Sequence, residues 1–375
     1  MKHNKEWKIL EFICTSGGAA DFGKHFTAIL KDGVFWGELI EQAVRHKLLP
    51  TLGYYVCKYG KNEQGEFASY IPVQIGMHLE EAFLANRHKA LVFKMKVREV
   101  ASFLCENSIP FVCTKGLVLD ATIYEEEGVR NFCVDVDFMI RQQDMAKVEQ
   151  GLKHRGFEYG YYDHFQDKVA PFARQEMVLY RMNPDHLPPM SIGTHDAIYR
   201  GVTIDFSSKF TWHNSDFEVN QDDAFKENVQ ILLSRRIENS YISSFSPRYQ
   251  FLFVLLHLFR EAWFERWMEF ENDVNLMKFS DIVRLWRHYQ LVLKDGIFWE
   301  IVQKNNIEMP VLWVLQHLDG AFSLNILDDL GIAERVSDAW LSSTHQSSMD
   351  SGDGWDGNMR DRLAWKDRKD FLTRK

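Results

Sequence analysis

The chain has 375 residues, 46% of them hydrophobic and 14% aromatic, which is enough for one large domain or two to three packed units. Its formal net charge of −9 argues against a general nucleic-acid-binding protein, because phosphate backbones are held mainly by an excess of Lys and Arg. The longest apolar run, residues 251–259, is about half a membrane span, and the first ten residues lack the apolar core of a signal peptide, so we expect a cytoplasmic protein without membrane contact.

The first section, residues 1–100, is predicted to be helical, since apolar residues recur every three to four positions from about residue 35 to 108. In the section that follows, residues 101–215, the spacing of the apolar residues changes. Residues 109–116 and 133–140 read as strands, and residues 117–128 and 141–157 as helices. Two further runs, 175–182 and 201–210, are strand-like and are separated by the turn-rich residues 183–196. We expect these runs to extend one sheet.

Helical periodicity returns in residues 216–340, where Ser246 and Ser280 are predicted helix N-caps. Residues 341–375 have the composition of a linker followed by a basic tail. The predicted fold is therefore α+β, with a small mixed sheet and its flanking helices between helical N-terminal and C-terminal sections.

Two aspartates interrupt the apolar strand at residues 133–140. Side chains two apart in a strand point to the same face, so Asp135 and Asp137 lie together. Asp205 interrupts the later apolar run in the same way. Carboxylates in such places need cationic partners or a metal, and Mg²⁺ prefers hard oxygen ligands. A half-exposed sheet with no metal remains the simpler interpretation of the aspartate pair taken alone.

A second candidate metal site is the pair His257 and Glu261, which lie four apart on one face of a predicted helix. Because no third ligand is evident in the sequence, we prefer a polar contact between helices for this pair.

The wider pattern runs Lys115-Gly116, Leu119, Tyr124, Arg130, Asp135-x-Asp137. This order resembles the nucleotidyltransferases of the polymerase-beta superfold, in particular a poorly characterised bacterial branch. The resemblance covers about residues 35–290, including the long helix before Lys115 and the later strand in which Asp205 precedes an aromatic stretch.

The resemblance implies a polymerase-beta-like core and an enzyme that transfers a nucleoside monophosphate, with AMP from ATP expected first, and releases pyrophosphate. Asp135, Asp137 and Asp205 would bind two Mg²⁺ ions, with Mn²⁺ as an alternative, and Asp205 would also serve as general base. Lys115, Gly116 and Arg130 would meet the triphosphate. The acceptor would be a hydroxyl or similar group on a small molecule, peptide or protein, and the net acidic charge disfavours nucleic acid.

The chain departs from the resemblance at two places. Relatives in the wider superfold carry Gly-Ser where this chain has Lys115-Gly116, and the branch often has His two residues after the third Asp, where this chain has Ser207. These departures leave open an alternative: an inactive module with this fold that binds a nucleotide or a partner.

Overall fold

The computed structural model describes residues 5–132, 135–269, 272–335, 338–345, 351–355, 358–364 and 372–373. The chain divides into two compact units, Met1–Phe83 with Phe251–Lys375 as unit 1 and Leu84–Gln250 as unit 2. Helix α5 begins in unit 1 and continues into unit 2. The section boundaries expected at residues 100, 215 and 340 remain a prediction.

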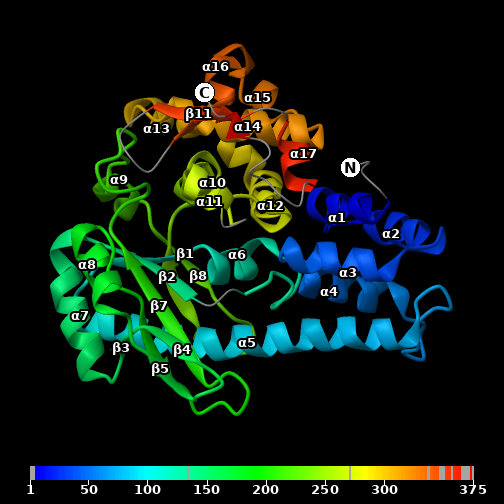
Figure 1. The fold of residues 1–375 in the computed structure, drawn as a ribbon, viewed down its shortest axis with the longest axis horizontal. Helices are drawn as coiled ribbons and strands as arrows, with labels where there is room; N and C mark the ends of the chain where they lie inside the picture. The colour runs from blue at the N-terminus through cyan, green and yellow to red at the C-terminus, as the bar shows by residue number, and fades with distance from the viewer. Residues whose placement is uncertain are drawn as a thin grey trace. The chain divides into compact units, whose positions relative to one another are not determined.

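Unit 1 is mainly helical (Figure 1). Its described elements are α1 (Lys5–Ser16), α2 (Phe22–Lys31), α3 (Trp36–Arg45), α4 (Leu49–Gly60), the start of α5 (Val73–Glu106), α10 (Pro247–Trp263, from Phe251), α11 (Glu265–Glu269), α12 (Leu276–Leu293), α13 (Ile297–Lys304), α14 (Glu308–Phe322), α15 (Ile326–Asp329), η2 (Ala333–Arg335), α16 (Asp338–Leu341), β10 (Ser343–His345), β11 (Ser351–Trp355), α17 (Met359–Ala364) and β12 (Leu372–Thr373).

The predicted N-cap Ser280 is wrong. Helix α12 begins one turn earlier, where the side chain of Asn275 accepts a hydrogen bond from the backbone N–H of Lys278. Ser280 is buried inside the helix, and its hydroxyl accepts a hydrogen bond from Nε of Arg284. Asn and Ser both cap helices well, so composition alone does not select between two candidates five residues apart.

Unit 2 contains the mixed α/β part of the chain (Figure 1). Besides the rest of α5, its described elements are β1 (Phe111–Thr114), α6 (Gly116–Ile123), β2 (Asp135–Ile140), η1 (Gln142–Asp144), α7 (Met145–His154), β3 (Glu158–Tyr159), β4 (Tyr161–Asp163), β5 (Lys168–Ala170), α8 (Arg174–Met182), β6 (Met190–Gly193), β7 (Gly201–Ser207), α9 (Gln221–Lys226), β8 (Val229–Leu232) and β9 (Tyr241–Ser244).

Seven of the described strands of unit 2 form one mixed sheet in the order β3-β6-β7-β2-β1-β9-β8. Strand β2 pairs in parallel with β7 and antiparallel with β1, so it lies at the centre. The predicted strands at β1, β2 and β7 and the predicted helices at α6 and α7 are confirmed within the described residues. Cys133 and Val134, which were predicted to begin the central strand, lie outside those residues.

One face of the sheet is the hydrophobic core of unit 2. Val136, Phe138 and Ile140 of β2 alternate toward this core, where the rings of Phe138 and Phe206 stack with centroids 5.2 Å apart. Apolar residues of α5 and α7 complete the same cluster. Because side chains alternate along a strand, Asp135 and Asp137 must point to the opposite face.

Three predicted elements of unit 2 differ in the structure. The strand predicted at residues 175–182 is helix α8, which begins where the Glu176 carboxylate accepts a hydrogen bond from the backbone N–H of Ala173. The turn-rich residues 183–196 contain strand β6, and the section predicted to be helical from residue 216 contains β8 and β9 of the sheet. Short apolar runs do not separate helix from strand by periodicity alone.

No helix among the described residues is both long enough and apolar enough to cross a membrane.

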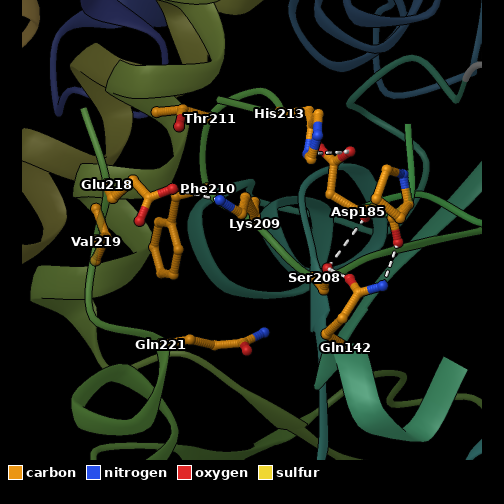
Figure 2. Close-up of a pocket in the computed structure, with 11 residues that line it drawn as sticks. Gln142, Asp185, Ser208, Lys209, Phe210, Thr211, His213, Glu218, Val219 and Gln221 are labelled. Atoms are coloured by element: carbon orange, nitrogen blue, oxygen red, sulfur yellow. Dashed lines mark hydrogen bonds and ion pairs between the residues drawn. The ribbon is translucent and has the colours of Figure 1, made fainter. Parts of the chain in front are cut away.

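Unit 2 contains a cavity of about 380 Å³ beside the carboxyl ends of β2 and β7, lined in part by Gln142 and Ser208 (Figure 2).

Candidate active site

Three carboxylates meet on the face of the sheet opposite the hydrophobic core. Asp137 of β2 is directly opposite Asp205 of β7 in the parallel register, and Asp135 is one same-face position before Asp137. One carboxylate oxygen from each residue lies within 4.8 Å of the other two. The structure thus brings together the three aspartates that the sequence singled out.

The charges in this cluster disfavour full ionisation. Partial loss of hydration and then the charge of Asp137 raise the pKa of Asp135 to about 6; Lys115 opposes this shift and Asp205 adds to it. Asp135 as a whole residue remains solvent-exposed. A cation placed between the three oxygens would relieve the repulsion.

The cluster fits a divalent metal ion by its donor set. All three donors are carboxylate oxygens, the hard ligands that Mg²⁺ prefers. Two oxygens bound to one Mg²⁺ are at most about 4.2 Å apart, so a 4.8 Å spread needs only a small side-chain adjustment.

Lys115 lies beside the cluster. Its Nζ is 2.5 Å from Oδ1 of Asp137, and its backbone has φ +53° and ψ −130° immediately before α6. Lys115 therefore supplies positive charge to the aspartates in the absence of a metal.

Gly116 and Arg130 are also brought together. A Cβ atom added at Gly116 would be 3.0 Å from Nη1 of Arg130, so the guanidinium group lies directly against this glycine. Arg130 is 8% exposed, and its Nη1 donates a hydrogen bond to the backbone carbonyl of Asn131. The two residues expected to meet phosphate thus lie next to each other at the start of α6.

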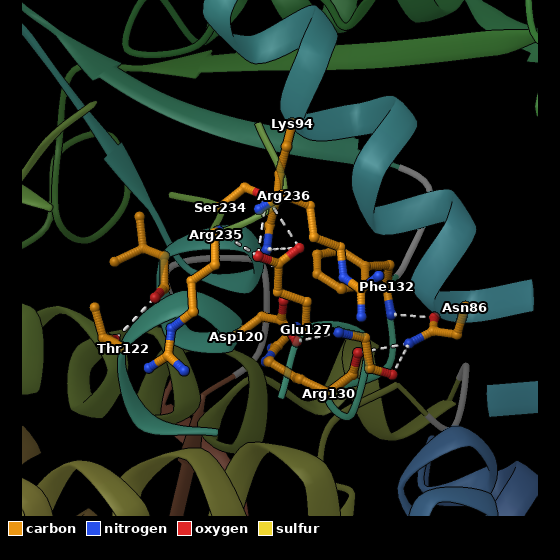
Figure 3. Close-up of polar contacts among 12 residues, drawn as sticks. Asn86, Lys94, Asp120, Thr122, Glu127, Arg130, Phe132, Ser234, Arg235 and Arg236 are labelled. Atoms are coloured by element: carbon orange, nitrogen blue, oxygen red, sulfur yellow. Dashed lines mark hydrogen bonds and ion pairs between the residues drawn. The ribbon is translucent and has the colours of Figure 1, made fainter. Parts of the chain in front are cut away.

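Asn86 of α5 holds the backbone that carries Arg130 (Figure 3). Its Nδ2 donates hydrogen bonds to the carbonyls of Gly128 and Arg130, both at 2.7 Å, and its Oδ1 accepts one from the N–H of Phe132 at 2.9 Å. Asn86 is buried, so these three bonds do not compete with water. Nothing in the local sequence around Asn86 indicated this role.

A buried ion cluster lies behind the same loop (Figure 3). Nζ of Lys94 is 3.0 Å from Asp120 and 3.7 Å from Glu127. The N–H of Gly128 donates to Asp120, and the hydroxyl of Ser234 donates to Glu127. These contacts connect α5, α6 and the β8–β9 connection to the segment that leads into β2.

His186 was not found from the sequence. It bridges to Ser207 beside the end of β7, and its Nδ1 is 3.8 Å from Oδ1 of Asp205. The resembling branch often has a His two residues after the third Asp, where this chain has Ser207. Here the imidazole of His186 lies next to Asp205 instead. The contact depends on the pairing of two segments about twenty residues apart, which no local pattern around His186 reveals.

Two tyrosines belong to the surroundings of the acidic cluster. Burial raises the pKa of Tyr161 in β4, and the carboxylates of Asp135 and Asp205 raise it further. Burial, followed by the neighbouring Tyr161, raises the pKa of Tyr180 in α8. Both phenols thus remain neutral at ordinary pH and can act as hydrogen-bond donors near the aspartates.

The other candidate metal pair makes a contact between helices, as expected. Nδ1 of His257 is 2.9 Å from Oε2 of Glu261, and Nζ of Lys278 in α12 is 2.7 Å from the same oxygen. The lysine takes the place that a metal would need.

The chain matches the family described as uncharacterised nucleotidyltransferase over residues 32–322, most of its length. The chain belongs to this family. A comparison with curated proteins found no match to this nucleotidyltransferase. Membership gives the general activity, transfer of a nucleoside monophosphate with a nucleoside triphosphate as substrate. The matched residues include all six predicted site residues.

Proposed function

We propose that this nucleotidyltransferase moves AMP from ATP onto a hydroxyl or similar acceptor of a small molecule, peptide or protein in the cytoplasm. The observation that supports the proposal most directly is the convergence of Asp135, Asp137 and Asp205 within 4.8 Å on one face of the sheet. Residues 101–215 would form a polymerase-beta-like core.

The three aspartates would hold two Mg²⁺ ions, or Mn²⁺. When bound, these ions would neutralise phosphate charge and lower the pKa of the acceptor hydroxyl. Lys115 and Arg130 would bind phosphate oxygens. Because Gly116 has no side chain, these oxygens could approach the backbone at the start of α6.

Asp205 would accept the proton of the acceptor hydroxyl as its oxygen attacks the α-phosphorus and the bond to the pyrophosphate oxygen breaks. His186, 3.8 Å from Asp205, would orient this carboxylate.

The test is pyrophosphate release and label transfer from each of the four NTPs with Mg²⁺, across a panel of acceptors. We expect Asp135→Ala and Asp137→Ala to lower turnover by at least 100-fold, because each removes a metal ligand. Asp222→Ala removes an exposed carboxylate of α9 in the same unit and should leave turnover unchanged. Alanine variants with wild-type turnover would refute the proposed site.

A second candidate is the inactive binding module. The ion pair between Lys115 and Asp137 favours it, since a metal must displace this lysine. Tight nucleotide binding by the wild type, without labelling of any acceptor or of the protein itself, would support this candidate.

A further inference from the structure

The cavity beside the ends of β2 and β7 contains a buried carboxylate with one oxygen that accepts no hydrogen bond from the described residues. Asp185 is 3% exposed, and its Oδ1 has no hydrogen-bond partner among the described residues. Figure 2 shows this carboxylate among the residues that line the cavity, facing the ring of His213. Nδ1 of His213 is 3.9 Å from Oδ1, which is too long for a hydrogen bond.

The position of Asp185 is set by its backbone. Its carbonyl accepts a hydrogen bond from the N–H of Ser208 at 2.8 Å. The preceding carbonyl, that of Pro184, accepts one from Nε2 of Gln142 at 2.5 Å. These bonds fix the backbone from which the Asp185 carboxylate projects into the cavity.

Several other polar residues of the cavity have protein partners apart from Asp185. Lys209 forms an ion pair with Glu218 at the rim, so these two charges offset each other. The hydroxyl of Ser208 also donates to Oε1 of Gln142 at 2.6 Å. What remains is Oδ1 of Asp185, which faces the His213 ring at 3.9 Å but accepts no hydrogen bond from the described residues, and a buried acceptor without a donor is costly.

We propose that this cavity binds a small organic cation, with a primary ammonium group on Asp185 and a compact apolar body against Phe210 and Val219. An ammonium group supplies the missing hydrogen-bond donor together with a full positive charge. Phe210 and Val219 line the same cavity, and its volume of about 380 Å³ is at the small end of ligand pockets.

This site is separate from the aspartate cluster, and the proposal does not depend on nucleotide transfer. His186, which adjoins Asp185 in the chain, lies against Asp205. None of the three aspartates of the cluster, and not His186, is among the residues that line the cavity.

The test is calorimetric titration of the full chain with 2-phenylethylamine, isopentylamine and putrescine, each compared with its neutral alcohol. We expect at least one amine to bind ten-fold or more tightly than its alcohol, and Asp185→Asn to abolish that preference. Glu99→Gln removes an exposed carboxylate of α5 that does not line the cavity and should leave amine affinity within two-fold. Equal binding of every amine and its alcohol, or an unchanged preference in Asp185→Asn, would overturn the proposal.

A second variant tests the proposal independently, in case Asp185→Asn does not fold. Val219→Trp fills the cavity while it keeps Asp185, and Val219 is only partly buried, so the fold should tolerate the larger ring. We expect Val219→Trp to lose amine binding with an unchanged unfolding temperature. If a folded Val219→Trp protein binds the amine as the wild type does, the amine binds elsewhere and the proposal is wrong.

Discussion

At the scale of single residues, Lys115 combines an unfavourable backbone with a central position in the candidate site. At φ +53° and ψ −130° a side chain crowds its own backbone, whereas glycine adopts this conformation freely. Such strain is of order 1–3 kcal/mol and persists where the surroundings hold it, often at functional sites. Here the ion pair with Asp137 and the following helix α6 hold the residue.

This strain makes a prediction about stability. We expect Lys115→Gly to be more stable than Lys115→Ala by about 1 kcal/mol, because both lose the ion pair but only glycine removes the strain. This order is the reverse of the usual one, in which glycine destabilises by adding freedom to the unfolded chain. Urea denaturation of the two variants measures the difference. An alanine variant as stable as the glycine variant would show that the backbone is relaxed at this position.

The residue scale also shows what the sequence can and cannot reveal. Asp135 and Asp137 were recognisable because the alternation of a strand places both on one face, and Asp205 because it interrupts a second apolar run. Asn86 and His186 were not recognisable from the sequence. The partners of Asn86 lie 42 or more residues away in the chain, the partner of His186 lies about 20 residues away, and both contacts are set by tertiary pairing. Local periodicity contains no information on such contacts.

At the scale of elements, the buried cluster of Lys94, Asp120 and Glu127 ties α5 to α6 and to the loop that carries Arg130. One positive charge faces two carboxylates there, and the side chains of Lys94 and Asp120 are fully buried. Removing one partner of such a pair leaves the other charge buried without compensation, and this costs about 3–5 kcal/mol.

We therefore expect Lys94→Met to lower the free energy of unfolding by about 3–5 kcal/mol, although methionine fits the apolar space of the lysine stem. Lys96→Met, two residues along α5, is the matched control. It removes only an i,i+3 pair with the exposed Glu99, and should cost less than about 1 kcal/mol. Chemical denaturation of both variants tests this. Similar losses in the two would mean that the buried cluster contributes no more than a surface pair.

Strands and helices were predictable to different extents. Apolar runs with clear boundaries predict strands β1, β2 and β7, and helical periodicity predicts helices α6 and α7. Residues 175–182 are strand-like in sequence, yet they form helix α8, which buries none of its residues. Strands β8 and β9 were missed because they join the sheet through β1, more than 110 residues earlier in the chain.

At the scale of the whole molecule, the response of stability to acid depends on groups that must lose their charge to be buried. His317 of α14 is such a group. Its Nε2 donates a hydrogen bond to the carbonyl of Leu341 at 3.1 Å, and its ring packs against Trp313 and Trp355. Burial, with a smaller contribution from nearby Arg362, lowers the pKa of His317 from 6.5 to about 3, although the hydrogen bond to Leu341 opposes the shift.

The sign of the effect follows from this direction. The unfolded chain binds a proton at His317 below pH 6.5, whereas the folded chain does not until about pH 3. The stability due to neutral His317 is therefore complete above pH 6.5 and falls as the pH is lowered toward 3. The upper limit of this loss is about 1.4 kcal/mol per pH unit.

We expect His317→Gln, which keeps a side-chain N–H donor but does not titrate, to gain up to about 2 kcal/mol relative to the wild type between pH 7.5 and pH 5. Urea denaturation at a series of pH values gives the difference directly, and other titrating groups cancel in the comparison. Parallel pH curves for wild type and His317→Gln would mean that His317 takes up its proton in the folded chain as readily as in the unfolded one, and the packing of Trp313 and Trp355 would then have to admit a charged ring.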